Sequence, residues 1–133
     1  MGRVLVVDDI LINRKAIAQL LEKSGHTVEM ARNGAEALAR LKQNRPDLIL
    51  LDQMMPEVDG LTFLAGIRRF PKYKEIPVIM LSGVTDPSCV NKAEALGVKE
   101  YLPKGEYSAE QLIESIDKYL PHDQGQFQPV APS

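Results

Sequence analysis

Acidic, hydroxyl and amino side chains follow four short apolar runs of the chain, and together they could carry phosphoryl chemistry. Asp8 and Asp9 come after the first run, Asp52 ends the third, Ser82 follows the fourth and Lys104 follows the fifth. Three neighbouring carboxylates cannot all stay ionised without a counter-charge. Magnesium supplies one, because it prefers carboxylate and carbonyl oxygens and is often completed by a phosphate. If these side chains converge, they predict a pocket for a divalent cation and a phosphoryl group.

The same residues predict a covalent role for one carboxylate. A carboxylate can attack phosphorus and form an acyl phosphate. Such transfer depends on positioning and on neutralising the charge of the phosphoryl oxygens, and the metal, the Lys104 ammonium and the Ser82 hydroxyl could each hold one oxygen. Their positions in the sequence do not decide which of the three acids is the nucleophile.

The elements that must position these residues can be read from the apolar pattern. Short continuous apolar runs are typical of strands buried on both faces of a parallel sheet. Such runs predict five strands, at Arg3 to Val7, Thr27 to Ala31, Asp47 to Leu51, Pro77 to Leu81 and Lys99 to Leu102.

Helical spacing and capping signals fill the intervals between these strands. Asn33 with Glu36, and Ser108 with Gln111, resemble capping boxes, and Gly25 suits a left-handed helix end. The predicted helices run from about Leu11 to Lys23, Asn33 to Gln43, Asp59 to Arg68, Asp86 to Gly97 and Ser108 to Leu120. The alternation predicts an α/β fold, a doubly wound five-stranded parallel sheet with five helices, whose ligands bind at the carboxyl ends of the strands.

Four stretches of the chain resemble the signature motifs of bacterial response-regulator receiver domains, the CheY-like superfamily. They are Val6 to Asp9, Leu50 to Gly60, Ile79 to Gly83 and Tyr101 to Lys104, and the resemblance runs from Arg3 to about Leu120. It implies a flavodoxin-like sheet with strand order 2-1-3-4-5, an order that the handedness rules alone do not give.

The resemblance also assigns the acids. It implies that Asp52 is the phosphoacceptor and that magnesium, with manganese as an alternative, is held by Asp8, Asp9, Asp52 and the backbone carbonyl of Met54. Ser82 and Lys104 would assist the transfer. The protein would then be a phosphoacceptor that catalyses its own phosphoryl transfer and dephosphorylation. It would not be an enzyme that acts on other substrates.

A coupled switch is implied by two further positions. In the family, the hydroxyl at Ser82 moves toward the phosphoryl group and the ring at Tyr101 turns inward, which alters the surface of the fourth helix, fifth strand and fifth helix. The implied partners are a histidine kinase or phosphotransfer protein and a downstream effector or fused output domain. A phosphorylation-dependent homodimer is also consistent with the family.

Two departures from the family pattern carry expectations of their own. The family usually has proline after the lysine, often with a cis peptide bond, whereas this chain has Gly105, so we expect a less rigid loop. Met54, two residues after Asp52, is apolar and cannot orient an attacking water, so we expect slow loss of the phosphoryl group.

Composition narrows the class of protein. The 133 residues are 44% hydrophobic and 26% charged, with a net charge of -2, which gives no pull toward nucleic acid or anionic lipid. The single Cys89 suits a reducing compartment, and the apolar run Val4 to Val7 is too short for a signal or a membrane span. We therefore expect a cytoplasmic receiver domain at 1–120 and a flexible tail or linker at 121–133, with no direct binding of nucleic acid or membrane.

Three other classes of protein share part of this pattern. A flavodoxin-like flavin carrier shares the topology, but Asp8-Asp9-Ile10 would repel a phosphate after the first strand. A haloacid-dehalogenase-like phosphatase needs an Asp-x-Asp arrangement there, which this sequence lacks. A phosphorylation-independent interaction domain would keep the same acids, and it stays open as the alternative. Taken singly, each site residue also has an ordinary role, such as Asp8 or Asp9 capping the first helix.

Overall fold

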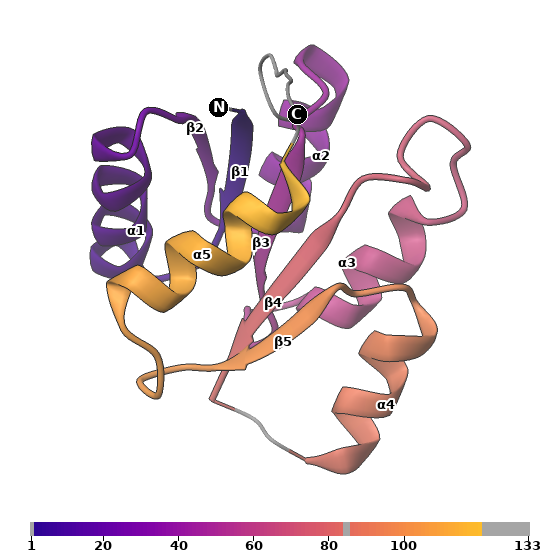
Figure 1. Cartoon of the computed structure of the whole chain (residues 1–133). Helices are drawn as coiled ribbons and strands as arrows, with labels where there is room; N and C mark the ends of the chain where they lie inside the picture. The colour runs from indigo at the N-terminus through magenta and orange to yellow at the C-terminus, as the bar shows by residue number, and fades with distance from the viewer. Residues whose placement is uncertain (1, 84–85, 121–133) are drawn as a thin grey trace, which may run out of the picture.

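The computed structural model describes residues 2–83 and 86–120, in which five strands alternate with five helices (Figure 1). The tail predicted at 121–133 lies outside the described residues. The strands are β1 (Arg3–Val7), β2 (Thr27–Ala31), β3 (Leu48–Asp52), β4 (Val78–Ser82) and β5 (Glu100–Pro103). The helices are α1 (Leu11–Lys23), α2 (Gly34–Gln43), α3 (Gly60–Ile67), α4 (Pro87–Ala95) and α5 (Ala109–Tyr119).

All neighbouring strands pair in parallel, in the order β2-β1-β3-β4-β5. The predicted fold class and strand order are therefore confirmed. The order reverses between β1 and β3, and this is where a doubly wound sheet binds its ligands, beyond the carboxyl ends of the strands.

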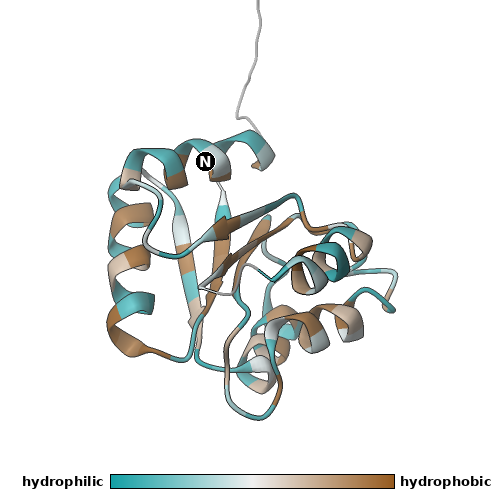
Figure 2. Cartoon of the chain, turned by 90° about the horizontal axis from the view of Figure 1, so that it is seen from below, coloured by the Kyte–Doolittle hydropathy of each residue, from teal (hydrophilic) through white to brown (hydrophobic). Residues whose placement is uncertain are grey.

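Two apolar layers separate the helices from the sheet. Strand residues such as Val6 and Leu50 pack with Leu112 and Ile116 of α5 on one side, and Leu5 and others pack with α2, α3 and α4 on the opposite side. Figure 2 shows hydrophobic stretches along the central strands, while the surrounding helices carry both hydrophilic and hydrophobic residues. The alternation of side chains along each strand feeds both layers, which is why the strands are apolar throughout.

Capping signals in the sequence are used by the helices nearly as predicted. Ser108 and Gln111 form a full capping box at α5, and Gly25 has the left-handed φ of 93°. Asn33 accepts a hydrogen bond from the backbone of Glu36 at 2.8 Å, but the Glu36 carboxylate accepts from the backbone N–H of Arg32 instead of that of Asn33. The second predicted capping box is therefore only half formed.

Three strands begin and end one residue later than predicted. β3 starts at Leu48, one residue after Asp47, whose backbone N–H donates to the Arg3 carbonyl at 2.8 Å and whose carboxylate accepts from the Arg3 N–H at 2.8 Å. The shift makes Asp52 and Ser82 the last residues of β3 and β4. In the described part of the chain, none of the helices is long and apolar enough to cross a membrane.

Candidate functional site

The carboxyl ends of four strands bring the predicted site residues to one edge of the sheet. In the β3–β4 register Asp52 is paired with Leu81, and in the β4–β5 register Ser82 is paired with Pro103. Asp8 follows β1 directly, and Lys104 follows β5. The sheet thus positions an acid, an acid, a hydroxyl and an amine side by side along its edge.

Three carboxylates form the acidic part of this site. One oxygen from each of Asp8, Asp9 and Asp52 lies within 4.8 Å of the others. Asp8 and Asp52 are both buried, each with 2% of the residue exposed. Asp9 Oδ1 and Asp52 Oδ2 are buried without a hydrogen-bond partner among the described residues. Buried carboxylate oxygens without donors are costly, and a hard divalent cation would satisfy them. The donor set therefore fits magnesium or manganese.

Asp8 is further constrained by the start of α1. Its Oδ1 accepts a hydrogen bond from the backbone N–H of Ile10 at 2.9 Å, and its carbonyl oxygen accepts from Arg14 at 2.9 Å. The N-cap of α1 is Ile10, which has no side-chain cap bond. Neither Asp8 nor Asp9 is therefore the N-cap residue of α1, although Asp8 orders its first turn.

Lys104 supplies the positive charge of the site. Its Nζ lies 3.1 Å from Asp52 Oδ1 and 3.4 Å from Asp8 Oδ2. Burial, and then repulsion from Asp8, raise the pKa of Asp52 to about 6, against the attraction of Lys104. Burial opposes the charge on Lys104, but Asp52 and Asp8 outweigh it and raise the pKa of the ammonium. One cation is shared by two buried carboxylates, so the site favours a second positive charge.

Backbone close to Asp52 is held by two residues that sequence reasoning did not single out. The Gln53 side chain is buried, and its Oε1 accepts a hydrogen bond from the N–H of Leu61 at 2.8 Å. The Gly60 N–H donates to the Gln53 carbonyl at 3.0 Å, and a Cβ at Gly60 would collide with the carbonyl oxygen of Asp52. The sequence predicted a helix starting at Asp59, but the close approach of Gly60 to Asp52 was not readable from that prediction.

The remaining predicted residues surround this centre at different depths. Ser82 is fully buried at the end of β4. Tyr101 is half-buried and packs against the apolar layer beneath α3 and α4. Met54 donates its backbone N–H to Asp52 Oδ1 at 3.2 Å, while its side chain is 59% exposed. The sheet thus gathers the acids and Lys104 closely, and leaves the Met54 side chain at the rim.

The loop that carries Lys104 is a turn built on glycine. Gly105 has a φ of 81°, which disfavours other residues and excludes proline, and cis peptide bonds are absent from residues 2–83 and 86–120. The Lys104 N–H donates to the Ser82 carbonyl at 2.8 Å, and the Glu106 N–H donates to the Pro103 carbonyl at 3.2 Å. The departure from the family pattern at Gly105 is therefore accommodated by a left-handed turn.

Tyr107 is a site neighbour that sequence reasoning missed. It lines a hollow of about 280 Å³ together with Asp8, Asn13 and Lys104, and its ring packs against the apolar layer beneath α1 and α5. Burial is the main cause that raises the pKa of its phenol. Its place three residues after Lys104 was the only signal in the sequence.

Comparison with known proteins identifies this arrangement. The profile of the response regulator receiver domain matches residues 4–117. The chain belongs to the response-regulator receiver family. Receiver domains are generally non-enzymatic signalling domains of two-component and chemotaxis systems. They bind Mg²⁺ or Mn²⁺ through acidic residues, and they interact with histidine kinases and with output or effector domains.

Relatives of this receiver include both single-domain and longer proteins. It is 37% identical to the chemotaxis protein CheY of Bacillus subtilis (strain 168), over 89% of this chain and 97% of CheY. It is 39% identical to the gliding motility regulatory protein of Myxococcus xanthus, over 87% of this chain and 15% of that protein. It is 42% identical to a protein-glutamate methylesterase/protein-glutamine glutaminase of Trichodesmium erythraeum (strain IMS101), over 89% of this chain. The receiver spans 35% of that last protein.

Solved structures show the same fold. The chemotaxis protein CheY4 of Vibrio cholerae superposes with a TM-score of 0.84 at 33% identity, covering 90% of this chain and 99% of that one. The Mn²⁺-bound form of response regulator Rcp1 superposes with a TM-score of 0.77 at 29% identity, covering 92% of this chain and 100% of that one. The likeness thus extends over the whole length of both neighbours.

Proposed function

We propose that this receiver accepts a phosphoryl group on Asp52 from a phosphohistidine of a histidine kinase or phosphotransfer protein. The observation that supports this best is the pairing of buried Asp52 with Lys104 at 3.1 Å beside two further acids. A solvated surface acid would need neither burial nor a shared cation. Perturbed charges gathered at the carboxyl edge of a doubly wound sheet are typical of a functional site.

Asp8, Asp9 and Asp52 would hold the cation, with the backbone carbonyl of Met54 as the fourth protein ligand. Two of the three carboxylates have a buried oxygen without a donor, which matches the need of such an ion for oxygen ligands. When bound, the cation supplies charge neutralisation for the transferred group. Magnesium is the proposed ion and manganese the alternative.

The residues of the chain divide the transfer between them. A carboxylate oxygen of Asp52 forms the bond to phosphorus, while the bond from phosphorus to the histidine nitrogen of the donor breaks and that nitrogen keeps the electron pair. Lys104 already lies against Asp52 and would follow the negative charge to a phosphoryl oxygen. The Ser82 hydroxyl would donate to another oxygen. Hydrolysis of the acyl phosphate on the same residues would reset the domain.

The proposed output is a change at the surface of α4, β5 and α5. Ser82 ends β4 and Tyr101 lies in β5, opposite Met80 in the register. A hydroxyl that moves toward the phosphoryl group would let the Tyr101 ring turn inward, and the surface beside it would change. The effector would be either a separate protein or a fused output domain. In the second case, residues 121–133 would be the linker between the receiver domain at 1–120 and that output domain. A homodimer formed on phosphorylation is consistent with the same surface, and the expected setting is the cytoplasm.

Beryllofluoride, which mimics an acyl phosphate, tests this function. We expect ¹⁹F NMR to show a bound resonance only with magnesium present, and none for Asp52→Asn, which keeps the shape of the side chain. Asp59→Asn is a matched control, because Asp59 is a half-buried acid that caps α3 and is not one of the three clustered carboxylates. Failure of the folded wild-type protein to bind magnesium or beryllofluoride would favour the alternative, an interaction domain that works without phosphorylation.

A further inference from the structure

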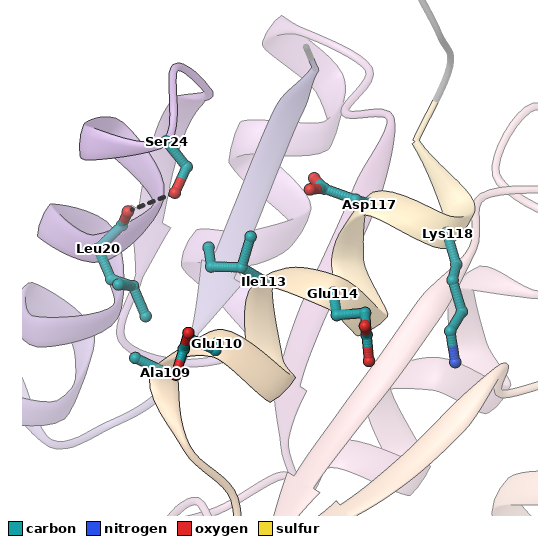
Figure 3. A pocket seen from close by; sticks show the side chains of 8 residues that line it. All are labelled: Leu20, Ser24, Ala109, Glu110, Ile113, Glu114, Asp117 and Lys118. Carbon is teal, nitrogen blue, oxygen red and sulfur yellow. Dashed lines mark hydrogen bonds between the residues drawn. The ribbon is translucent and has the colours of Figure 1, made fainter.

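A second hollow lies between α1 and α5, along the flank of the molecule and not at the carboxyl edge of the sheet. Its volume is about 660 Å³. Figure 3 shows its lining, which comes from Leu20 of α1, from Ser24 at the C-cap of α1, and from Ala109, Glu110, Ile113, Glu114, Asp117 and Lys118 of α5. None of these residues belongs to the phosphoacceptor site. We call it the α1–α5 groove.

The floor of the α1–α5 groove is apolar. Leu20 and Ile113 are only partly buried and pack at the margin of the apolar layer that holds Leu112 and Ile116. In Figure 3 the Leu20 side chain points toward α5 and the Ile113 side chain points toward α1. Because these two side chains are only partly buried, they leave exposed apolar surface in the groove that a partner could cover.

The rim of the α1–α5 groove is acidic. Glu110, Glu114 and Asp117 are exposed and place their carboxylates along α5. Lys118, the one cation in the lining, points away from α1 in Figure 3 and forms an ion pair with Glu100 at 3.3 Å. Its charge is therefore already matched outside the groove. Asp117 lies 3.1 Å from His26 Nε2 but keeps 54% of its side chain exposed.

We propose that the α1–α5 groove binds a basic amphipathic helix of a partner protein. The lining of α5 runs from Ala109 to Lys118, a length of roughly 14 Å at 1.5 Å per residue, which fits about three turns of a docked helix. Apolar side chains of such a helix would cover Leu20 and Ile113, and flanking lysine or arginine would meet the carboxylates on the rim. The apolar residues at the bottom of the groove and the carboxylates on its rim would thus each contact one side of the docked helix.

A groove between α3 and α4 is similar in size to the α1–α5 groove but differs in charge. Its volume is about 540 Å³, close to that of the α1–α5 groove. Its lining includes one cation, Lys92, and one carboxylate, Asp59, which already caps α3 by accepting from the Thr62 N–H at 2.8 Å. A basic helix would gain nothing there from complementary charge. The two grooves of similar size therefore form a natural pair for comparison.

The test uses the full chain and two synthetic twelve-residue helical peptides. One carries leucine along one side with flanking lysines, and the other has glutamate at each lysine position. We expect two-dimensional ¹H–¹⁵N NMR shifts from the lysine peptide to centre on Leu20, Ile113 and Asp117, with affinity that falls as salt rises. The glutamate peptide should bind at least tenfold more weakly. The Asp52→Asn protein should bind equally well, since the proposal goes beyond the phosphoacceptor function and does not require it.

Charge-reversal variants make the test specific. Glu110→Lys with Glu114→Lys should weaken the lysine peptide at least tenfold, and both residues are exposed, so the fold should persist. Glu75→Lys with Glu94→Lys makes the same charge change at exposed sites elsewhere and should leave affinity within twofold. Equal loss in both double variants, or shifts centred on α3 and α4, would overturn the proposal. A dimer that Ile113→Lys dissociates, without peptide binding, would replace it with self-association.

Discussion

The Lys104 ammonium lies between two buried acids, 3.1 Å from Asp52 Oδ1 and 3.4 Å from Asp8 Oδ2. Two strands at opposite sides of the site, β1 and β5, thus reach the same point next to the end of β3. One positive charge faces three carboxylates, and that imbalance is the physical reason for proposing a cation and a phosphoryl group here.

Removing the ammonium should slow phosphorylation. For Lys104→Met we expect the rate with a small-molecule phosphodonor to fall about 10² to 10³-fold, since a charged group that stabilises a transferring phosphoryl oxygen is lost. The rate is measured by intact mass against time. Lys99→Met removes an exposed lysine at the opposite end of β5 and should leave the rate unchanged. Equal rates for Lys104→Met and wild type would show that Lys104 has no part in the transfer.

The raised pKa of Asp52 predicts a pH dependence of stability in metal-free protein. Its pKa is about 6 in the folded state against 3.8 ordinarily, so the folded state binds more protons between these values. The contribution of Asp52 to the free energy of unfolding is therefore fully present below about pH 4 and is lost as pH rises through about 6. The loss is of the order of 3 kcal/mol at most.

Denaturant unfolding in EDTA checks this window. Asp52→Asn does not titrate, so the difference in free energy of unfolding between it and wild type should shift in its favour from pH 4 to pH 7. If the difference in free energy of unfolding stays constant across this range, the pKa of Asp52 is not raised in the folded state. With magnesium in place of EDTA, wild-type stability near pH 7 should be restored.

Gly60 predicts a steric effect at the base of the site. A Cβ there would collide with the Asp52 carbonyl, and we expect Gly60→Ala to lower the free energy of unfolding by about 1–3 kcal/mol. Gly66 lies in the same helix with open space around it, so Gly66→Ala should be neutral or stabilising by up to about 1 kcal/mol. Urea unfolding of both variants measures the difference. Equal free energies of unfolding for Gly60→Ala and Gly66→Ala would contradict the close approach of Gly60 to the Asp52 carbonyl.

Met54 predicts a long-lived acyl phosphate. Its exposed apolar side chain stands at the rim of the site and offers no polar group to a water that attacks phosphorus. Met54→Asn should shorten the half-life of the phosphorylated protein by roughly tenfold, because a positioned polar group can orient that water. Met54→Leu should leave it unchanged. The half-life is followed by intact mass after removal of the donor, and a wild-type half-life that is already short would refute the prediction.

Much of the fold was predictable because each element carries a local signal. The apolar runs fixed five strands to within one residue, and Ser108, Asp59 and Asp86 each cap the helix predicted to follow them. Strand order came from the family resemblance. Local propensity could not predict the hydrogen bond from the Arg3 N–H to the Asp47 carboxylate, since that bond joins residues 44 positions apart.

The sequence predicted which residues form the site but not the contacts between them. Convergence of Asp8, Asp52 and Lys104 follows from parallel strands, but a shared ammonium at 3.1 and 3.4 Å depends on tertiary packing. The hollow beside Tyr107 and the Gly60 approach to Asp52 depend on neighbours far along the chain. Local sequence patterns carry no information on such distances.

Intact-mass spectrometry with peptide mapping shows directly whether Asp52 accepts a phosphoryl group. The protein is incubated with a small-molecule phosphodonor and magnesium, beside an EDTA control and Asp52→Asn. We expect a single phosphoryl adduct on the wild type only, dependent on magnesium and mapped to Asp52. An adduct on Asp8 or Asp9, or none on a folded wild-type protein, would contradict it.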